Sequence, residues 1–127
     1  SNFSFNSLTF CGHPSMSTKY INPALGRFEP DLDVALHDAD VVMTLRIQYE
    51  RFEETLNLDL EEYKQAYELT SERLEQAKGD AIVMHPGPVN YIEISESVYQ
   101  CDQSVIRTQI ANGVAIRMAV LSRFLSS

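Results

Sequence analysis

The chain has 127 residues and a formal net charge of −8, from 10 basic and 18 acidic side chains. This length suits one domain, residues 1–127, with a core of its own. The acidic balance argues against nucleic acid or an anionic membrane as a partner, and no apolar run is long enough to span a bilayer. Cys11 and Cys101 lie far apart without metal-ligand spacing, which favours free thiols in a reducing, cytoplasmic setting.

Short strands and helices are expected to alternate from the start of the chain. Leu8–Cys11 is a short strand candidate, and residues 13–30, rich in Pro, Ser, Asn and Gly, indicate a connection. A short helix is expected over residues 31–37, because acidic side chains at its start favour the helix dipole. The β-branched run over residues 41–45 lacks polar alternation and predicts a central parallel strand covered on both faces.

Three helices and one further strand are predicted in the second half. Helices are expected over residues 60–67 and 70–77, followed by a buried strand over 81–84. Residues 104–125 form an amphipathic pattern, in which Gly113 suggests a close packing contact. The apolar stripe of this helix consists of Ile106, Ile110, Val114, Met118, Leu121 and Leu125. The order of elements predicts an α/β fold with a parallel sheet and right-handed crossovers.

Polar side chains follow the strand predicted over residues 41–45. Arg46 and Gln48 lie at its carboxyl end, where open α/β sheets bind ligands, and both point the same way if the chain is still extended. A guanidinium pairs with a carboxylate or phosphate, and an amide beside it can donate or accept. Two alternatives stay open: an ordinary loop amide for Gln48, and for Arg46 an ion pair with Glu50, Glu53 or Glu54.

The strand over residues 81–84 leads into His85-Pro86-Gly87-Pro88. Its prolines fix φ and lack an N–H, so this loop is expected to be stiff and to present backbone carbonyls in fixed directions. Together with Arg46, the loop could hold a small molecule that bears both a carboxylate and an amine. The alternative is a stiff strand-to-helix connection with His85 hydrogen-bonded to backbone. No nucleophile triad, phosphate loop or metal cluster is recognisable, so no catalytic side chain or metal is predicted.

Longer stretches around these residues resemble aspartate carbamoyltransferase catalytic chains. Val41–Arg51 resembles the aspartate-binding segment of that family, and Asp80–Asn90 resembles its proline loop. Residues 103–107 and 112–119 continue the match in order, so that the resemblance extends over residues 31–125. Ornithine carbamoyltransferases typically carry His-Cys-Leu-Pro in this loop, and the aspartate branch therefore fits better.

The resemblance implies a Rossmann-like three-layer domain with a parallel sheet, the second domain of the carbamoyltransferase fold. It implies transfer of a carbamoyl group from carbamoyl phosphate to the amine of L-aspartate in de novo pyrimidine biosynthesis, without a cofactor. By position, Arg46 would grip an aspartate carboxylate with the help of Gln48. The backbone of Gly87 and Pro88 would accept hydrogen bonds near the carbamoyl group. The residues that would position loops are His85, Glu50 and Arg51.

Several departures from the family pattern bear on activity. The carbamoyl phosphate-binding domain, with its Ser-Thr-Arg-Thr motif, does not occur in these 127 residues, so this chain alone is expected to be inactive. Complete members of the family form trimers. Tyr91 stands where many relatives have arginine, and the segment before Leu8 is short. These departures keep a second function open, that of a non-catalytic homologue acting as a structural partner in assemblies of pyrimidine-pathway enzymes.

Overall fold

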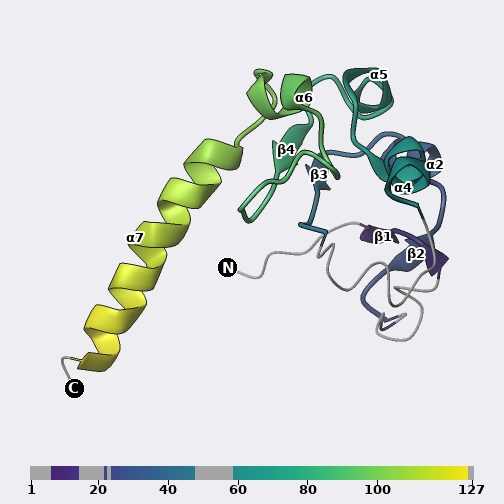
Figure 1. Cartoon of the computed structure of the whole chain (residues 1–127). Coiled ribbons are helices and arrows are strands. Elements are labelled where there is room, and N and C mark those ends of the chain that lie inside the picture. Colours follow the sequence, from purple (N-terminus) through teal and green to yellow (C-terminus); the bar gives the residue numbers. More distant parts are fainter. Residues whose placement is uncertain (1–6, 15–21, 23, 48–58, 126–127) are drawn as a thin grey trace.

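The computed structural model describes residues 7–14, 22, 24–47 and 59–125 (Figure 1). Helices are interspersed with strands within them, and the strands pair in parallel, which confirms the predicted α/β class. Strand β1 (Thr9–Cys11) pairs with β2 (Arg27–Glu29), and β3 (Val41–Met43) pairs with β4 (Ile82–Met84). In the described part of the chain these strands form two separate two-stranded sheets.

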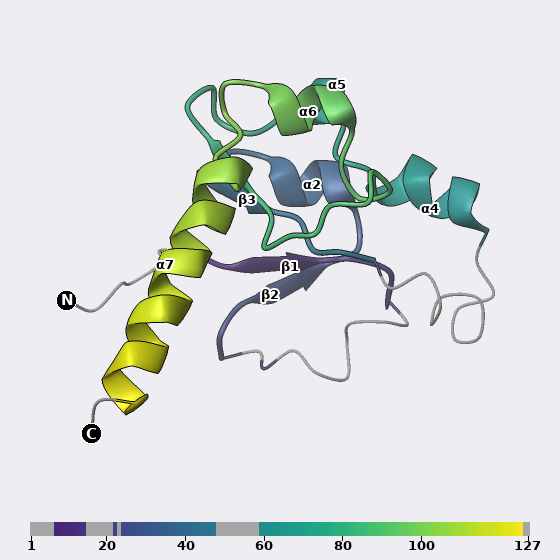
Figure 2. The same ribbon diagram turned by 60° about the vertical axis from the view of Figure 1, so that its left-hand side comes forward.

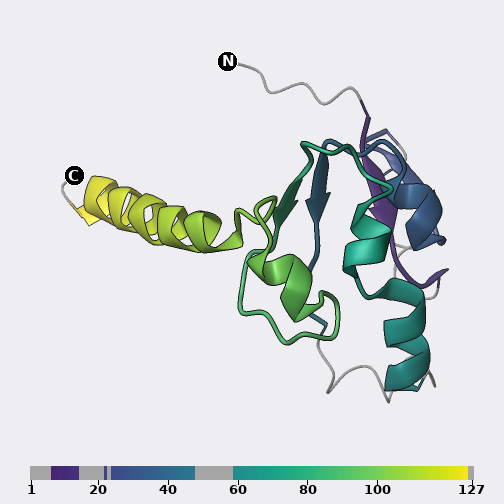
Figure 3. The ribbon, with the colours of Figure 1, turned by 90° about the horizontal axis from the view of Figure 1, so that it is seen from above.

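The register of β3 and β4 decides where the chain leaves their sheet. The paired residues are Val41 with Ile82, Val42 with Val83, and Met43 with Met84. Beyond the last pair, the Thr44 N–H donates a 3.0 Å hydrogen bond to the Met84 carbonyl. The two parallel strands lie side by side and end level, so the segments that follow them emerge at the same edge (Figure 3).

The expectation that residues 41–45 form a central strand covered on both faces was wrong. Val41 and Met43 are 47% and 51% exposed, and their neighbour Ile82 is 38% exposed. Val83 points to the opposite face and is fully buried. One face of the β3–β4 sheet therefore packs on the core while the other is open. A run of apolar residues cannot distinguish these faces, because both carry side chains of the same kind.

Four of the five described helices begin directly after a capping side chain. The described helices are α2 (Leu32–Leu36), α4 (Leu60–Tyr67), α5 (Ser71–Leu74), α6 (Glu96–Gln100) and α7 (Ile106–Leu125). The caps of the first four are Asp31, Asp59, Thr70 and Ser95. Each cap accepts a hydrogen bond from an N–H that has no partner inside its helix. Four helices were predicted within a few residues of these bounds, whereas α6 and the three-residue strand β2 were not.

The main core lies between β4 and helices α2, α5 and α6, with the first turn of α7 closing it (Figure 2). Its buried members are Leu36, Leu69, Leu74, Ala77, Ala81, Val83, Ile94, Val98 and Ile106. A second, smaller cluster joins Ile47 and Tyr63, with Tyr67 and Ile92 packed against them. This second cluster anchors the chain directly after β3, since Ile47 belongs to that segment.

Helix α7 projects away from the rest of the domain in all three ribbon views (Figures 1, 2 and 3). Ile106 in its first turn is fully buried, but the rest of the predicted apolar stripe is exposed, from 39% at Ile110 to 83% at Leu125. A Cβ at Gly113 would meet only the Arg117 guanidinium, at 3.7 Å or more, so the expected close packing contact is not present here. Among the described helices, none has the length and hydropathy needed to cross a bilayer.

Candidate functional site at the ends of β3 and β4

The tips of β3 and β4 are joined by a side-chain hydrogen bond. Asn90, in the loop after β4, donates from Nδ2 to the Ile47 carbonyl at 3.1 Å. Its Oδ1 accepts from the Ile92 N–H at 3.3 Å, so both halves of the amide are used. Because Ile47 is buried in the second cluster, this bond ties the loop after β4 to a fixed point. The structure thus brings together the two strand ends that sequence analysis singled out.

Arg46 lies at this joined edge with an exposed side chain. No acidic side chain in the described part of the chain forms an ion pair with it. The acidic residues proposed as alternative partners, and the predicted site residues Gln48, Glu50 and Arg51, lie outside the described residues. Of the predicted arginine and amide pair, the structure therefore places only the guanidinium.

His85 lies beneath the proline loop and has no exposed surface. Its Nδ1 accepts a 2.8 Å hydrogen bond from the Gly87 N–H, which is the backbone contact that the alternative interpretation gave to this histidine. The other ring nitrogen, Nε2, lies 2.8 Å from Oε1 of Glu93. Since Nδ1 accepts, Nε2 carries the hydrogen and donates it to the carboxylate. His85 is therefore placed to orient the loop and is out of reach of a ligand.

Gly87 adopts a backbone conformation that favours glycine. Its φ is +72°, and a Cβ built there would lie 3.2 Å from Cδ1 of Ile110 on α7. No described residue donates a hydrogen bond to the carbonyl oxygens of Gly87 or Pro88, and Pro88 is exposed. Within the described part of the chain these two oxygens are therefore available as acceptors.

Glu93 is a buried carboxylate that sequence analysis missed. It is 3% exposed, and its Oε1 accepts from His85 and, at 3.4 Å, from the Asn90 N–H. Its Oε2 is buried and has no hydrogen-bond partner. The one signal in the sequence is an acidic residue between Ile92 and Ile94, where the apolar neighbours indicate a buried segment.

Tyr63 of α4 borders the same region from the second cluster. Burial is the main cause that raises the pKa of its phenol, and the neighbouring Tyr67 and the charge of Glu93 add to it. The rings of Tyr63 and Tyr67 lie with centroids 5.0 Å apart. The packing next to the joined ends of β3 and β4 is therefore aromatic, and burial there keeps the Tyr63 phenol neutral.

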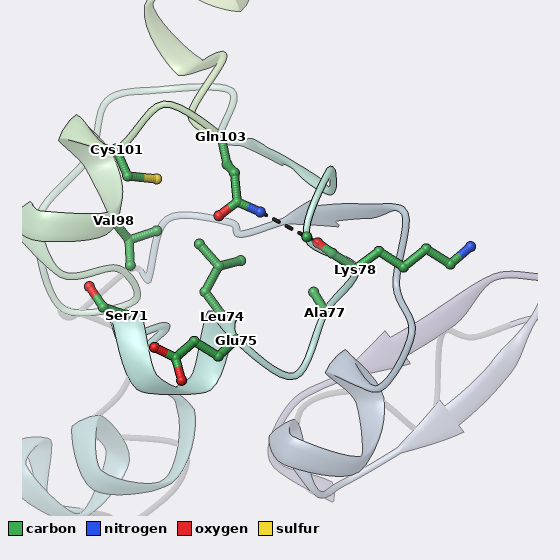
Figure 4. Close-up of a pocket in the computed structure, with 9 residues that line it drawn as sticks. Ser71, Leu74, Glu75, Ala77, Lys78, Val98, Cys101 and Gln103 are labelled. Carbon is green, nitrogen blue, oxygen red and sulfur yellow. Dashed lines mark hydrogen bonds between the residues drawn. The ribbon is translucent and has the colours of Figure 1, made fainter.

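A cavity of about 390 Å³ lies elsewhere, between α5, α6 and the turn that precedes β4 (Figure 4). Leu74, Ala77 and Val98 form its apolar part, and Gln103 donates to the Lys78 carbonyl at its rim. Because Lys78 and Gly79 precede β4 while the proline loop follows it, this cavity is at the opposite end of the strand from Arg46. None of the predicted site residues lines it. In the described ranges, no group of three His, Cys, Asp or Glu side chains could hold a metal ion.

Comparison with known proteins gives a family match over most of the chain. The family model for the Asp/Orn-binding domain of aspartate/ornithine carbamoyltransferases matches residues 17–124. The chain is 53% identical over 92 residues to the aspartate carbamoyltransferase catalytic subunit of Citrifermentans bemidjiense, covering 72% of this chain and 30% of that protein. It is 51% identical over 96 residues to the same subunit of Xanthomonas oryzae pv. oryzae, covering 75% and 30%. The chain thus spans about 30% of the length of these relatives.

Solved structures give the same result. Aspartate transcarbamoylase from Trypanosoma cruzi in complex with carbamoyl phosphate aligns with a TM-score of 0.63 at 33% identity, over 76% of this chain and 30% of that one. Its complex with N-(phosphonacetyl)-L-aspartic acid aligns with a TM-score of 0.64 at 32% identity, over the same shares. Ornithine carbamoyltransferase from Pyrococcus furiosus, at 24% identity and a TM-score of 0.65 over 76% of this chain and 31% of that one, shares the fold. The chain therefore belongs to the aspartate/ornithine carbamoyltransferase family, in which it corresponds to the Asp/Orn-binding domain of an aspartate carbamoyltransferase catalytic subunit.

Proposed function

We propose that this chain binds L-aspartate as part of an aspartate carbamoyltransferase, which transfers a carbamoyl group from carbamoyl phosphate to the aspartate amine. The observation that carries the proposal is the Asn90–Ile47 hydrogen bond, which draws the Arg46 segment and the proline loop to one edge of the β3–β4 sheet. The family match supports the choice of substrates, since a T. cruzi relative was solved with carbamoyl phosphate.

In this proposal Arg46 binds a carboxylate of aspartate. A guanidinium forms two parallel hydrogen bonds with a carboxylate, and this geometry fixes the ligand's orientation as well as its affinity. The exposed Arg46 side chain, unpaired with any described acid, is available for such a contact. Gln48 would assist from the same segment, with Glu50 and Arg51 positioning the loop that follows.

The proline loop would act at the carbamoyl group. Gly87 and Pro88 would accept hydrogen bonds through their carbonyl oxygens, and His85 would hold the loop from below through the Gly87 N–H. The aspartate amine attacks the carbamoyl carbon and phosphate leaves, so the protein supplies orientation and stabilises charge on the transferring group. The C–N bond forms as the bond from the carbamoyl carbon to the phosphate oxygen breaks, and the leaving phosphate takes the proton that the amine loses, so no side chain of this chain is assigned as a proton acceptor.

The remaining part of such a catalytic chain, its carbamoyl phosphate-binding domain, is the proposed partner, with the complete protein forming the family's trimer. Helix α7 supports this, because Ile116, Met118, Leu121 and Phe124 are 60% to 75% exposed. Exposed apolar surface of this extent marks an interface. Mixing the chain with the separately produced carbamoyl phosphate-binding domain of the C. bemidjiense relative should yield carbamoyl aspartate, whereas neither part alone should.

Isothermal titration calorimetry with L-aspartate or succinate tests the binding site directly. We expect weak binding that Arg46→Ala reduces about 10-fold or more, because a hydrogen bond to a charged group contributes roughly 1.5–3 kcal/mol. Arg123→Ala, near the far end of α7, is the matched control and should bind like the parent chain. Equal affinities in the parent and Arg46→Ala would remove Arg46 from the site.

One observation favours a second function, a non-catalytic partner within an assembly. The ring of Tyr91, at the position where the family resemblance implies arginine in many relatives, meets Tyr99 edge-on with centroids 5.9 Å apart. The position therefore provides an aromatic contact and no positive charge beside the proline loop. A complete absence of aspartate binding, in the chain and in its complex with the carbamoyl phosphate-binding domain, would support this function instead.

A further inference from the structure

We infer that Glu93 is a positioning residue, which couples the proline loop to the segment that carries Arg46. The inference rests on the proposed function for its consequence in binding, but the coupling itself is a property of the described residues. A single carboxylate oxygen, Oε1, receives hydrogen bonds from two donors that lead to different strand tips. No role was predicted for Glu93 from the sequence.

The backbone around Glu93 gives this carboxylate a rigid base. Its carbonyl accepts from the Leu69 N–H at 3.1 Å, and the adjoining Ile94 forms a bridge with Leu69. Leu69 and Ile94 are both among the most deeply buried residues of the core. Because burial of a carboxylate costs free energy unless it is hydrogen-bonded, a buried glutamate at such a rigid place is expected to serve its donors.

One branch from Glu93 leads to the proline loop. Nε2 of His85 donates to Oε1 at 2.8 Å, and this fixes both the ring orientation and the tautomer. Nδ1 is then an acceptor, and it takes the Gly87 N–H at 2.8 Å. This relay holds the Pro86–Gly87 peptide plane through its N–H, and the Gly87 carbonyl lies in the next peptide plane, directly beyond the Gly87 Cα. Without the carboxylate, the imidazole could turn or change tautomer and present an N–H to the Gly87 N–H.

The other branch leads to the segment after β3. The Asn90 N–H donates to the same Oε1 at 3.4 Å, and the Asn90 side chain donates to the Ile47 carbonyl at 3.1 Å. Ile47 adjoins Arg46, so the direction of the proposed carboxylate-binding arginine depends on the same anchor. Glu93 thus fixes the spacing between the guanidinium and the loop carbonyls without touching the ligand.

Nuclear magnetic resonance of the isotope-labelled 127-residue chain tests the coupling without relying on activity. The His85 ring nitrogens report the tautomer, and hydrogen exchange of the Gly87 amide reports its bond to Nδ1. In Glu93→Ala we expect a changed tautomer population, Gly87 exchange at least about 10-fold faster, and a shifted Ile47 signal. Glu93→Gln keeps an oxygen acceptor at the same reach, so it should preserve all three. Glu96→Gln, on the exposed side of α6, is the matched control for charge removal.

Two outcomes would overturn the inference. One is a folded Glu93→Ala chain in which the His85 tautomer and the Gly87 exchange rate match those of the parent. The other is a purely structural result, in which every core amide exchanges faster by the same factor as Gly87. If Glu93→Ala does not fold, Glu93→Asp replaces it, since its shorter side chain withdraws the carboxylate while the charge is kept; the same readouts and the same two outcomes then apply.

Aspartate calorimetry on the same variants separates this inference from the proposed function. A parent chain that binds aspartate should lose affinity in Glu93→Ala and retain it in Glu93→Gln. A parent chain that binds no aspartate, but whose Gly87 and Ile47 signals respond to Glu93→Ala as expected, would contradict the proposed function and leave the coupling established. Unchanged affinity in a Glu93→Ala chain whose loop signals have shifted would remove the role of Glu93 in binding.

Discussion

Asn90 and Ile47, 43 positions apart in sequence, are joined by a 3.1 Å hydrogen bond from a side-chain amide to a backbone carbonyl. The bond crosses from the loop after β4 to the segment after β3, at the edge where both parallel strands end. It converts two neighbouring strand ends into one surface that carries Arg46 on one side and the proline loop on the other. A substitution at Asn90 should therefore affect both the segment that carries Arg46 and the proline loop.

Asn90→Asp removes the Nδ2 donor and sets a carboxylate oxygen against the Ile47 carbonyl, while Oδ1 can still accept from the Ile92 N–H. We expect the free energy of unfolding in urea to fall by about 1–3 kcal/mol, the usual cost of leaving a buried polar group unsatisfied. Asn112→Asp, at an exposed position of α7, should change it by less than about 0.5 kcal/mol. Equal losses in the two variants would contradict a specific role for the Asn90–Ile47 bond.

Gly87→Ala should destabilise the chain because its φ of +72° is unfavourable for an L side chain and its Cβ would lie 3.2 Å from Cδ1 of Ile110. The conformational part alone should lower the free energy of unfolding by about 1–2 kcal/mol. Adding Ile110→Val removes Cδ1 and should recover only the steric part. Gly113→Ala serves as the opposite case: its Cβ would meet the flexible Arg117 guanidinium at 3.7 Å, an ordinary contact distance, in the interior of α7, so it should raise stability by about 0.5–1 kcal/mol. Thermal or urea unfolding of the parent chain and the three variants measures these differences.

Two isoleucines of α7 should respond in opposite ways to truncation. Ile106 is fully buried in the core, so Ile106→Ala should lower the free energy of unfolding by about 2–5 kcal/mol. Ile116 is 64% exposed, and Ile116→Ala should change it by no more than about 0.5 kcal/mol. The same denaturation experiment measures both. A large loss in Ile116→Ala would mean that α7 packs against another molecule even in the purified chain, which light scattering would reveal.

Tyr63 should make stability fall at high pH. Burial raises the pKa of its phenol in the folded chain, whereas the unfolded chain begins to lose this proton near pH ~10. Above that pH the unfolded state binds fewer protons than the folded state, so the free energy of unfolding decreases as pH rises. Below pH ~10 the contribution of Tyr63 to the free energy of unfolding is fully present. Tyr63→Phe removes the ionisable group, so the slope of stability against pH above ~10 should become flatter. A slope identical to that of the parent chain would contradict this account.

Local patterns were sufficient for most of the secondary structure. The helix start at Asp31 was recognisable because acidic side chains there favour the helix dipole, and the one at Thr70 because a cap acts on N–H groups two or three residues away. Strand β2 was missed because three residues, Arg27–Glu29, contain too short a pattern, and only pairing with β1 makes them a strand. The burial of Val41 and Met43 was wrongly predicted because exposure depends on which part of the protein covers each face of the sheet.

The site was predictable only in part. Arg46 and the loop from His85 to Pro88 were found because they follow apolar strands directly and because their neighbours resemble the family's motifs. The contact of His85 with backbone was anticipated, but its partner Glu93 was not, because the pairing depends on how the loop folds back over the strand.

By itself the sequence determined the parallel α/β class, the starts of four of the five described helices and the family, because each depends on side chains that are close along the chain. Only the tertiary structure decided that Glu93 holds His85, that Asn90 reaches Ile47, and that α7 buries its first turn and leaves the rest open. These facts depend on which surfaces meet across long separations in sequence, and no periodicity of apolar residues specifies the partner that covers them.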